Sequence, residues 1–181
     1  MPLILDNPVR TYAWGSPTVI PDLLGVPPTG EPQAELWMGA HPSAPSIAEI
    51  GGERVSLAEL IEKDPPGMLG AEVVERFGPR LPYLLKILAV ERPLSIQAHP
   101  NGEQAAQGFA AEEAAGVPLD AVHRSYRDRS HKPEMVVALT EFEALLGFRD
   151  PTRSADLIDT LDVPDLRTAS SRLRDEGAAA L

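Results

Sequence analysis

A short stretch in the middle of the chain alternates polar and apolar side chains, from Ser95 through Gln97 to His99. Residues two apart point to the same face of a β-strand, so this alternation predicts that the three polar side chains share one face. By the same rule, Lys132 and Glu134 share a face of a later strand. An amide oxygen, an imidazole and a carboxylate form a mixed ligand set that suits zinc and other divalent ions. The types and spacing therefore predict a metal site made by Gln97, His99 and Glu134.

The same pattern is typical of a strand with one face in water, and spacing by itself leaves that interpretation open. A glutamine oxygen is also a less usual zinc ligand than an imidazole or a carboxylate. With Glu134 as the single anionic ligand, a divalent ion would keep about one net positive charge, which favours a Lewis-acid role on substrate oxygens.

The composition limits the classes of function that such a site could serve. The chain has 181 residues, 43% of them hydrophobic, and no apolar run approaches the roughly 20 residues of a membrane helix. It contains no cysteine, which excludes disulfides and thiolate metal sites and fits a cytoplasmic protein without a signal peptide. Sixteen basic against 27 acidic residues give a net charge of −11, so we expect neither a nucleic-acid nor a membrane partner.

The elements that must position these residues are mainly short strands. A Gly51-Gly52 pair predicts a hairpin turn, and alternation or β-branched content predicts strands at 3–5, 35–38, 84–88, 95–99, 134–139 and 141–148.

Helices are expected between some of these strands and at the end of the chain. Ser56 and Glu59 form a capping box for a helix that stops near Asp64, and further helices are expected at 68–77 and at 103–115, with Asn101 as cap. Helical spacing begins at Pro151 and continues to the end. We therefore expect a metal-binding domain at 1–149 and the start of a helical domain at 150–181.

Several motifs occur together in an order that resembles the type I phosphomannose isomerase (mannose-6-phosphate isomerase) family. The resemblance covers residues 3 to about 150 and is carried by the stretches NPVRTYAWGS at 7–16, AELWMGAHP at 34–42, LLKIL at 84–88, LSIQAHP at 94–100, HKPE at 131–134 and FEALLGFR at 142–149. One departure is Arg129-Ser130, where the family often has Pro-Asn.

This resemblance implies a mainly β fold, a jelly-roll-like cupin barrel with short helical excursions, which holds one zinc ion. It implies interconversion of mannose 6-phosphate and fructose 6-phosphate, hence mannose metabolism, and we expect the full-length protein to be a monomer. Gln97, His99 and Glu134 match the family's first three zinc ligands. The fourth is a later histidine without a counterpart among the four histidines of this chain. We therefore expect an N-terminal fragment that is poorly active alone.

Two residues are the candidates for proton transfer in the isomerisation. Lys132 stands beside the ligand Glu134, and burial near a metal ion would make it a better base; its alternative role is an electrostatic contact with phosphate or a hydroxyl. His131 is a candidate for relaying a proton or assisting ring opening.

Four further residues are assigned to binding the sugar phosphate. Lys86 interrupts an apolar strand, where a buried ammonium needs water or an anion. Glu35 resembles a pocket-lining carboxylate that could orient Lys86 or Lys132 by charge pairing. Trp14 could be core or a wall of the sugar pocket, and Ser95 shares the ligand face.

Two other functions remain open at this stage. The first is a non-catalytic cupin module that binds metal or sugar. The second is a cupin oxygenase, which needs two histidines and a carboxylate, and which we rank last because a His-x-His pair is absent.

Overall fold

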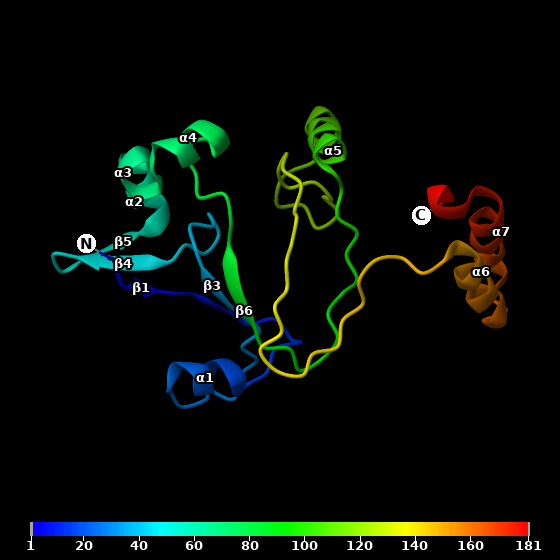
Figure 1. Cartoon of the computed structure of the whole chain (residues 1–181), viewed down its shortest axis with the longest axis horizontal. Coiled ribbons are helices and arrows are strands. Elements are labelled where there is room, and N and C mark those ends of the chain that lie inside the picture. Colours follow the sequence, from blue (N-terminus) through cyan, green and yellow to red (C-terminus); the bar gives the residue numbers. More distant parts are fainter. Residues whose placement is uncertain (1, 181) are drawn as a thin grey trace. The chain divides into compact units, whose positions relative to one another are not determined.

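A computed structural model describes residues 2–180, in which short antiparallel strands are joined by short helices and long irregular segments (Figure 1). The chain divides into two compact units, Met1–Ala98 and His99–Leu181, and each is described separately. Among the described residues, no helix is both long and apolar enough to cross a membrane.

The first sheet of the first unit contains the expected hairpin. Its strands are β1 (Leu5–Asp6), β4 (Ile47–Ile50) and β5 (Glu53–Ser56), and β4 lies in the middle with both neighbours antiparallel. The loop is Gly51-Gly52 with φ values of 61° and 86°. Two positive φ values make a turn whose twist matches the strands, which is why glycine occupies both positions.

The second sheet has the order β2-β3-β6, with β2 at Val9–Arg10, β3 at Glu35–Met38 and β6 at Leu85–Leu88, all antiparallel. Strand β3 was expected, β6 was expected one residue longer, and β2 was not expected, because Asn7-Pro8 precedes it as a turn signal.

Alternation gives this second sheet two different faces. Leu36 is buried in a small core with Ile20 of helix α1 (Val19–Leu24) and Ala89, and Val9 and Ile87 pack against this core. The intervening residues of the same strands point the opposite way. This second face, which we call the polar face, carries Arg10, Glu35, Trp37 and Lys86.

A close backbone crossing holds the Trp14-Gly15 motif beside this sheet. Gly15 pairs with Val90, Ser16 pairs with Gln33, and the carbonyl of Trp14 accepts hydrogen bonds from the N–H groups of residues 91 and 92. A Cβ at Gly15 would lie 2.5 Å from the backbone of Ala34. No real Cβ approaches so closely, so the crossing requires glycine here.

The helical excursion of the first unit follows β5. Helix α2 (Leu57–Lys63) starts at the expected capping box, with both the Ser56 and Glu59 hydrogen bonds present. The single helix expected at 68–77 is wrong, because the segment forms α3 (Pro65–Leu69) and α4 (Ala71–Phe77). Gly70 separates them at a φ of 85°, outside the helical region.

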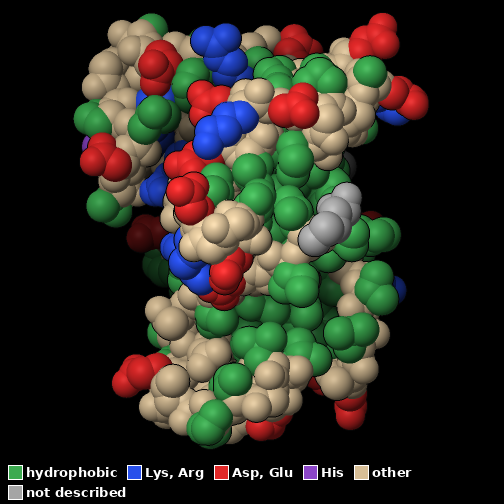
Figure 2. Space-filling model, turned by 90° about the vertical axis from the view of Figure 1, so that its left-hand side faces the viewer, with side chains coloured by type: hydrophobic (Ala, Val, Ile, Leu, Met, Phe, Trp, Pro, Cys, Tyr) green, Lys and Arg blue, Asp and Glu red, His purple; other side chains and the backbone are tan. Residues whose placement is uncertain are grey.

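Apolar side chains are exposed around α1. Val19, Leu23, Leu24 and Val26 are all about half-exposed. Figure 2 shows hydrophobic side chains gathered in the lower part of the face, the level at which α1 lies in Figure 1.

The second unit contains α5 (Gly102–Ala114), the longest helix of the described residues, which Asn101 caps as the sequence predicts. Gln104, which was not expected to take part, completes a capping box. A helical pair follows an irregular segment: α6 (Pro151–Thr160) and α7 (Arg167–Glu176), with 3₁₀ turns η1 (Pro164–Leu166) and η2 (Gly177–Ala180). Small residues, Ala155 and Ser170, are buried where α6 and α7 pack together.

The strands expected at 95–99, 134–139 and 141–148 are wrong: residues 93–100 and 131–138 have no regular structure, and 141–148 has none either. The strand expected at 3–5 begins only at Leu5. Alternation indicates which face of a strand would be apolar, but a strand also needs a backbone partner. In the described chain these segments have no ladder, and their apolar side chains lie in water, Ile96 being 89% exposed.

Candidate metal centre and substrate residues

Two of the three expected ligands lie together in the second unit. His99 Nδ1 is 3.8 Å from one oxygen of Glu134, Oε2. The other oxygen, Oε1, is 3.1 Å from Lys132 Nζ. One carboxylate thus stands between an imidazole and an ammonium, although it lies 35 positions after the histidine in the sequence. An imidazole nitrogen beside a carboxylate oxygen is a donor pair that fits zinc.

Two anchors hold these residues. His99 lies just before Asn101, whose side chain caps α5. His131 lies against the first turn of the same helix, since its Nδ1 is 3.6 Å from where a Cβ of Gly102 would stand. The start of α5 therefore brings the segments around His99 and His131 together.

The segment leading to His131 is itself clamped onto α5 by Arg124. The Arg124 side chain is 0% exposed and lies over the Phe109 ring, where it pairs with Glu112 at 3.6 Å and Glu113 at 2.8 Å. It also donates to the backbone carbonyls of Val117 and Tyr126. The clamp thus ties both ends of the loop after α5 to the helix.

Glu112 completes the clamp by accepting backbone hydrogen bonds. The N–H groups of Ser125 and Tyr126 donate to its two oxygens at 2.9 and 2.8 Å. These bonds favour the charged carboxylate, so they hold the pKa of Glu112 below its ordinary value, and the nearby Arg124 lowers it further.

The remaining residues of the expected ligand face lie in the first unit. Ser95 and Gln97 are exposed in the irregular segment, so the shared strand face that the alternation predicts does not form. The role of Gln97 as a third ligand stays a prediction. No group of three or more His, Cys, Asp or Glu side chains that could hold a metal occurs among residues 2–180.

Lys132 also differs from the expectation in one respect. Its side chain is 54% exposed and paired with Glu134, so the burial expected around it does not occur. His131 is likewise exposed.

The structure joins the two charged residues predicted for substrate binding on the polar face of the second sheet. Glu35 is only 7% exposed, and its Oε2 accepts from Lys86 Nζ at 3.3 Å and from the Trp37 Nε1–H at 2.5 Å. The Lys86 ammonium also lies 4.8 Å from the centroid of the Trp37 ring. Of the two lysines that the sequence offers as partners of Glu35, the structure shows the contact with Lys86, and the part of this pair in substrate binding stays a prediction.

Trp14 is half-buried and stacks on Tyr12, with ring centroids 5.8 Å apart and an angle of 23° between the planes. It is therefore not a core residue.

Three residues of these clusters were missed from the sequence: Trp37, Arg10 and Arg124. Trp37 had a usable signal, because it follows Glu35 by two positions in an expected strand and must share its face. Arg10 had none, since the Trp37 ring on which it lies is on another strand, and Arg124 had none, since its burial depends on how the loop after α5 folds back on the helix.

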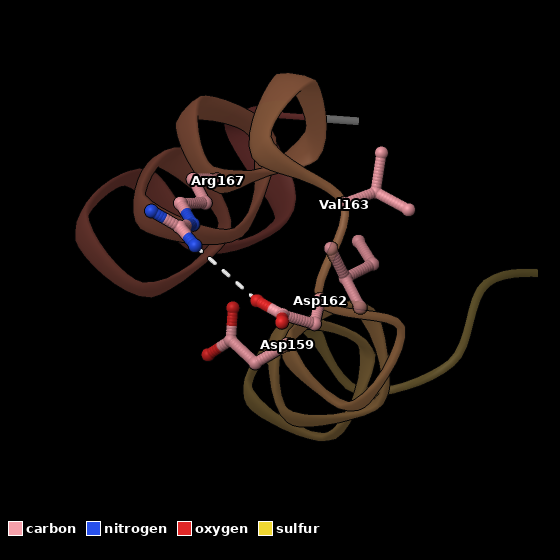
Figure 3. Close-up of a pocket in the computed structure, with 5 residues that line it drawn as sticks. Asp159, Asp162, Val163 and Arg167 are labelled. Carbon is pink, nitrogen blue, oxygen red and sulfur yellow. Dashed lines mark hydrogen bonds and ion pairs between the residues drawn. The ribbon is translucent and has the colours of Figure 1, made fainter.

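A shallow hollow of about 190 Å³ lies between α6 and α7 (Figure 3). Arg167 reaches across to Asp162 at 3.2 Å, and Asp159 points toward the same space. None of the predicted site residues lines this hollow.

Comparison with known proteins identifies the family. The family model for the catalytic domain of type I phosphomannose isomerase matches residues 3–151. The chain belongs to the type I phosphomannose isomerase family. Mannose-6-phosphate isomerase of Salmonella typhimurium is 52% identical over 148 residues, a match that covers 81% of this chain and 38% of the relative.

Solved phosphomannose isomerase structures resemble the whole described chain. A K86A variant of the Salmonella typhimurium enzyme matches 98% of this chain and 45% of its own, with 45% identity and a TM-score of 0.81. The enzyme of that organism bound to fructose 6-phosphate and zinc matches with 44% identity and a TM-score of 0.79. The expected fold class, a mainly β cupin-type fold with short helices, is thereby confirmed. The chain spans about two fifths of the length of the curated relative.

Proposed function

We propose that this chain is the N-terminal part of a zinc-dependent aldose–ketose isomerase that interconverts mannose 6-phosphate and fructose 6-phosphate. One observation supports this most directly: within a member of this family, the imidazole of His99 and the carboxylate of Glu134 lie 3.8 Å apart, with Lys132 on the second carboxylate oxygen. Zinc and fructose 6-phosphate are bound in the solved Salmonella typhimurium relative.

The donor set of this chain fits zinc. His99 and Glu134 offer a nitrogen and an oxygen side by side, both side chains partly exposed, and Gln97 is proposed as the third ligand. When bound, zinc would supply Lewis-acid stabilisation of the oxygen on which negative charge develops.

The reaction moves a proton between C1 and C2 of the sugar, and this chain offers two groups for that step. Lys132 is favoured as the group that carries the proton, because its Nζ lies beside the metal ligand Glu134. His131, held against α5, is the second candidate and would assist ring opening.

Glu35 and Lys86 are proposed to bind the sugar phosphate, together with Trp14 and Ser95. Glu35 is almost buried and holds the Lys86 ammonium in place. A preorganised cation binds an anionic group at a lower cost in side-chain entropy than a mobile one.

A coupled assay for fructose 6-phosphate formation tests the proposal. It should be run with zinc on residues 1–181 and on the full-length gene product. We expect zinc-dependent turnover by the longer protein and little turnover by residues 1–181, because we propose that a fourth ligand comes from a later segment. Absence of turnover by the longer protein would refute the isomerase proposal, and substantial turnover by residues 1–181 would refute the need for a further ligand.

A non-catalytic module that binds metal or sugar is the second candidate for residues 1–181 taken alone. It is favoured by the length of the match, since the chain corresponds to only 38% of the Salmonella typhimurium relative. This alternative would be supported if residues 1–181 bind zinc without turnover and the full-length gene product, assayed separately, is also inactive.

A further inference from the structure

Arg10 shares the polar face of the second sheet with Glu35, Trp37 and Lys86. In the antiparallel register, Arg10 is opposite Glu35 on one side of β3, and Lys86 is opposite Trp37 on the other side. All four side chains therefore leave the sheet on the side away from its apolar core.

Aromatic rings hold the Arg10 guanidinium in place. Its Cζ lies 4.9 Å from the centroid of the Trp37 ring and 5.7 Å from that of Tyr12. The ammonium of Lys86 lies 4.8 Å from the same Trp37 ring. Stacking on a ring leaves the edge donors of a guanidinium available, because they lie in its own plane.

The charges on the polar face do not balance. Glu35 supplies one negative charge, and its Oε2 is already shared by Lys86 and the Trp37 indole. Within residues 2–180 the ion pairs of the structure do not include Arg10, so its charge is not neutralised on this face. Two cations and one carboxylate leave this face with one positive charge in a chain whose net charge is −11.

We propose that Arg10 and Lys86 together bind the phosphate group of the sugar phosphate, with Trp37 as the platform that holds both cations. A guanidinium offers two parallel N–H donors to a phosphate, whereas an ammonium acts as a point charge. The two cations are thus complementary rather than redundant. The identity of the sugar phosphate rests on the proposed function, but phosphate binding itself does not.

Nuclear magnetic resonance of residues 1–181 tests this proposal without zinc or activity. The chain has only two tryptophans, so two indole N–H signals are expected, and Trp37→Phe identifies one of them. Metal-free protein is titrated separately with inorganic phosphate, fructose 6-phosphate and fructose. We expect both phosphates to shift the Trp37 indole signal, and fructose to leave it unchanged, because the cations recognise the charge.

Variants of Arg10 then identify its contribution. Arg10→Gln should weaken phosphate binding by about tenfold, the effect of losing a hydrogen bond between charged groups, and Arg10→Lys should recover part of the loss. Arg54→Gln is the matched control, because it removes the same charge from an exposed arginine paired with Asp6 on the other sheet. It should change binding little.

Unchanged phosphate affinity in Arg10→Gln, or an equal loss in Arg54→Gln, would overturn the proposal. In the longer, active protein, Arg10→Gln should raise KM with kcat nearly unchanged. If the longer protein has no isomerase activity but Arg10→Gln still abolishes the phosphate shift, the proposed function fails and the phosphate site stands. If the longer protein is an active isomerase and Arg10→Gln alters neither KM nor phosphate affinity, the proposed function stands and the phosphate site fails.

Discussion

At the scale of single residues, this chain repeatedly places one carboxylate between a cation and a second polar group. Glu134 lies between His99 and Lys132, and Glu35 lies between Lys86 and the Trp37 indole. The two carboxylates differ in burial: the Glu35 residue is only 7% exposed, whereas the Glu134 side chain is 48% exposed. Removing Glu134 should therefore affect ligand binding, whereas removing Glu35 should also affect folding.

Replacing Glu134 by alanine should lower the zinc affinity of residues 1–181 by about tenfold or more, since it removes the only anionic ligand proposed. Isothermal titration calorimetry with zinc measures the change. Glu143→Ala is the matched control, because it removes an exposed carboxylate from the same irregular segment and should leave the affinity unaltered. Equal zinc affinities for the unaltered chain, Glu134→Ala and Glu143→Ala would exclude Glu134 from the ligand set.

Replacing Glu35 by alanine should destabilise the fold by about 1–3 kcal/mol, because the buried Trp37 indole N–H loses its acceptor. Glu35→Gln should cost less, since the amide oxygen can still accept from the indole. Denaturation by urea measures both. If Glu35→Ala lowered the free energy of unfolding no more than Glu35→Gln, the hydrogen bond from the Trp37 indole would contribute nothing to stability.

At the scale of elements, helix α5 positions the catalytic candidates. Its capped start lies between His99 and His131, and its second half holds the Arg124 clamp. Gly108, in the middle of the helix, lies under the Tyr126 ring, and a Cβ there would overlap ring atoms. The segment that carries Lys132 and Glu134 therefore depends on packing against this helix.

The ionisation of Glu112 should make the clamp sensitive to acid. Because its pKa is lower in the folded than in the unfolded chain, its contribution to stability is present above the unfolded pKa and is lost as the pH falls through the folded pKa. The free energy of unfolding should thus decline below about pH 5, and Glu112→Gln should make that decline shallower. Asp159 and Glu176 also have lowered pKa values, so part of the decline should persist. An identical pH profile for the variant would contradict this prediction.

Replacing Gly108 by alanine should destabilise α5, although alanine in a helix interior is normally about 0.5–1 kcal/mol better than glycine. The overlap with the Tyr126 ring reverses the sign, because the ring must move away from the helix. Thermal unfolding measures the effect. Ala106→Gly, on the exposed side of the same helix, should cost only the ordinary propensity difference. If Gly108→Ala were more stable than the unaltered chain, the Tyr126 ring would be able to move away from the helix at little cost, which would contradict the prediction.

At the scale of the whole chain, much apolar surface is left in water along the irregular segment before α6. Leu145 and Leu146 are almost fully exposed, and Met135, Val136 and Leu139 are largely so. Patches of this kind mark surfaces that other polypeptide covers. The chain corresponds to about two fifths of its curated relative, so residues 1–181 alone should associate in solution.

Light scattering over a concentration series should therefore show self-association of residues 1–181. Leu146→Lys, at a side chain that is 99% exposed, should reduce it without loss of folded stability, because no packing is removed. Glu143→Gln changes the net charge by the same one unit without removing apolar surface, and it should reduce association less. A monodisperse wild-type chain at all concentrations would contradict the expectation.

The sequence by itself determined those features that depend on neighbouring residues and on the family motifs. The hairpin at Gly51-Gly52 and the capped starts of α2 and α5 follow from local backbone requirements. The family follows from motifs whose order and spacing a single chain displays. The Glu35–Lys86 pair was within reach, because both residues stand in apolar strands where each charge needs a partner.

Only the tertiary structure decided which elements find partners. The stretches 95–99 and 134–139 alternate or are β-branched, yet they form no strand, because backbone pairing depends on another segment and not on local pattern. The cations on the Trp37 ring come from β2 and β6, which are far apart in the sequence. Such contacts depend on long-range register, which no local pattern of residue types encodes.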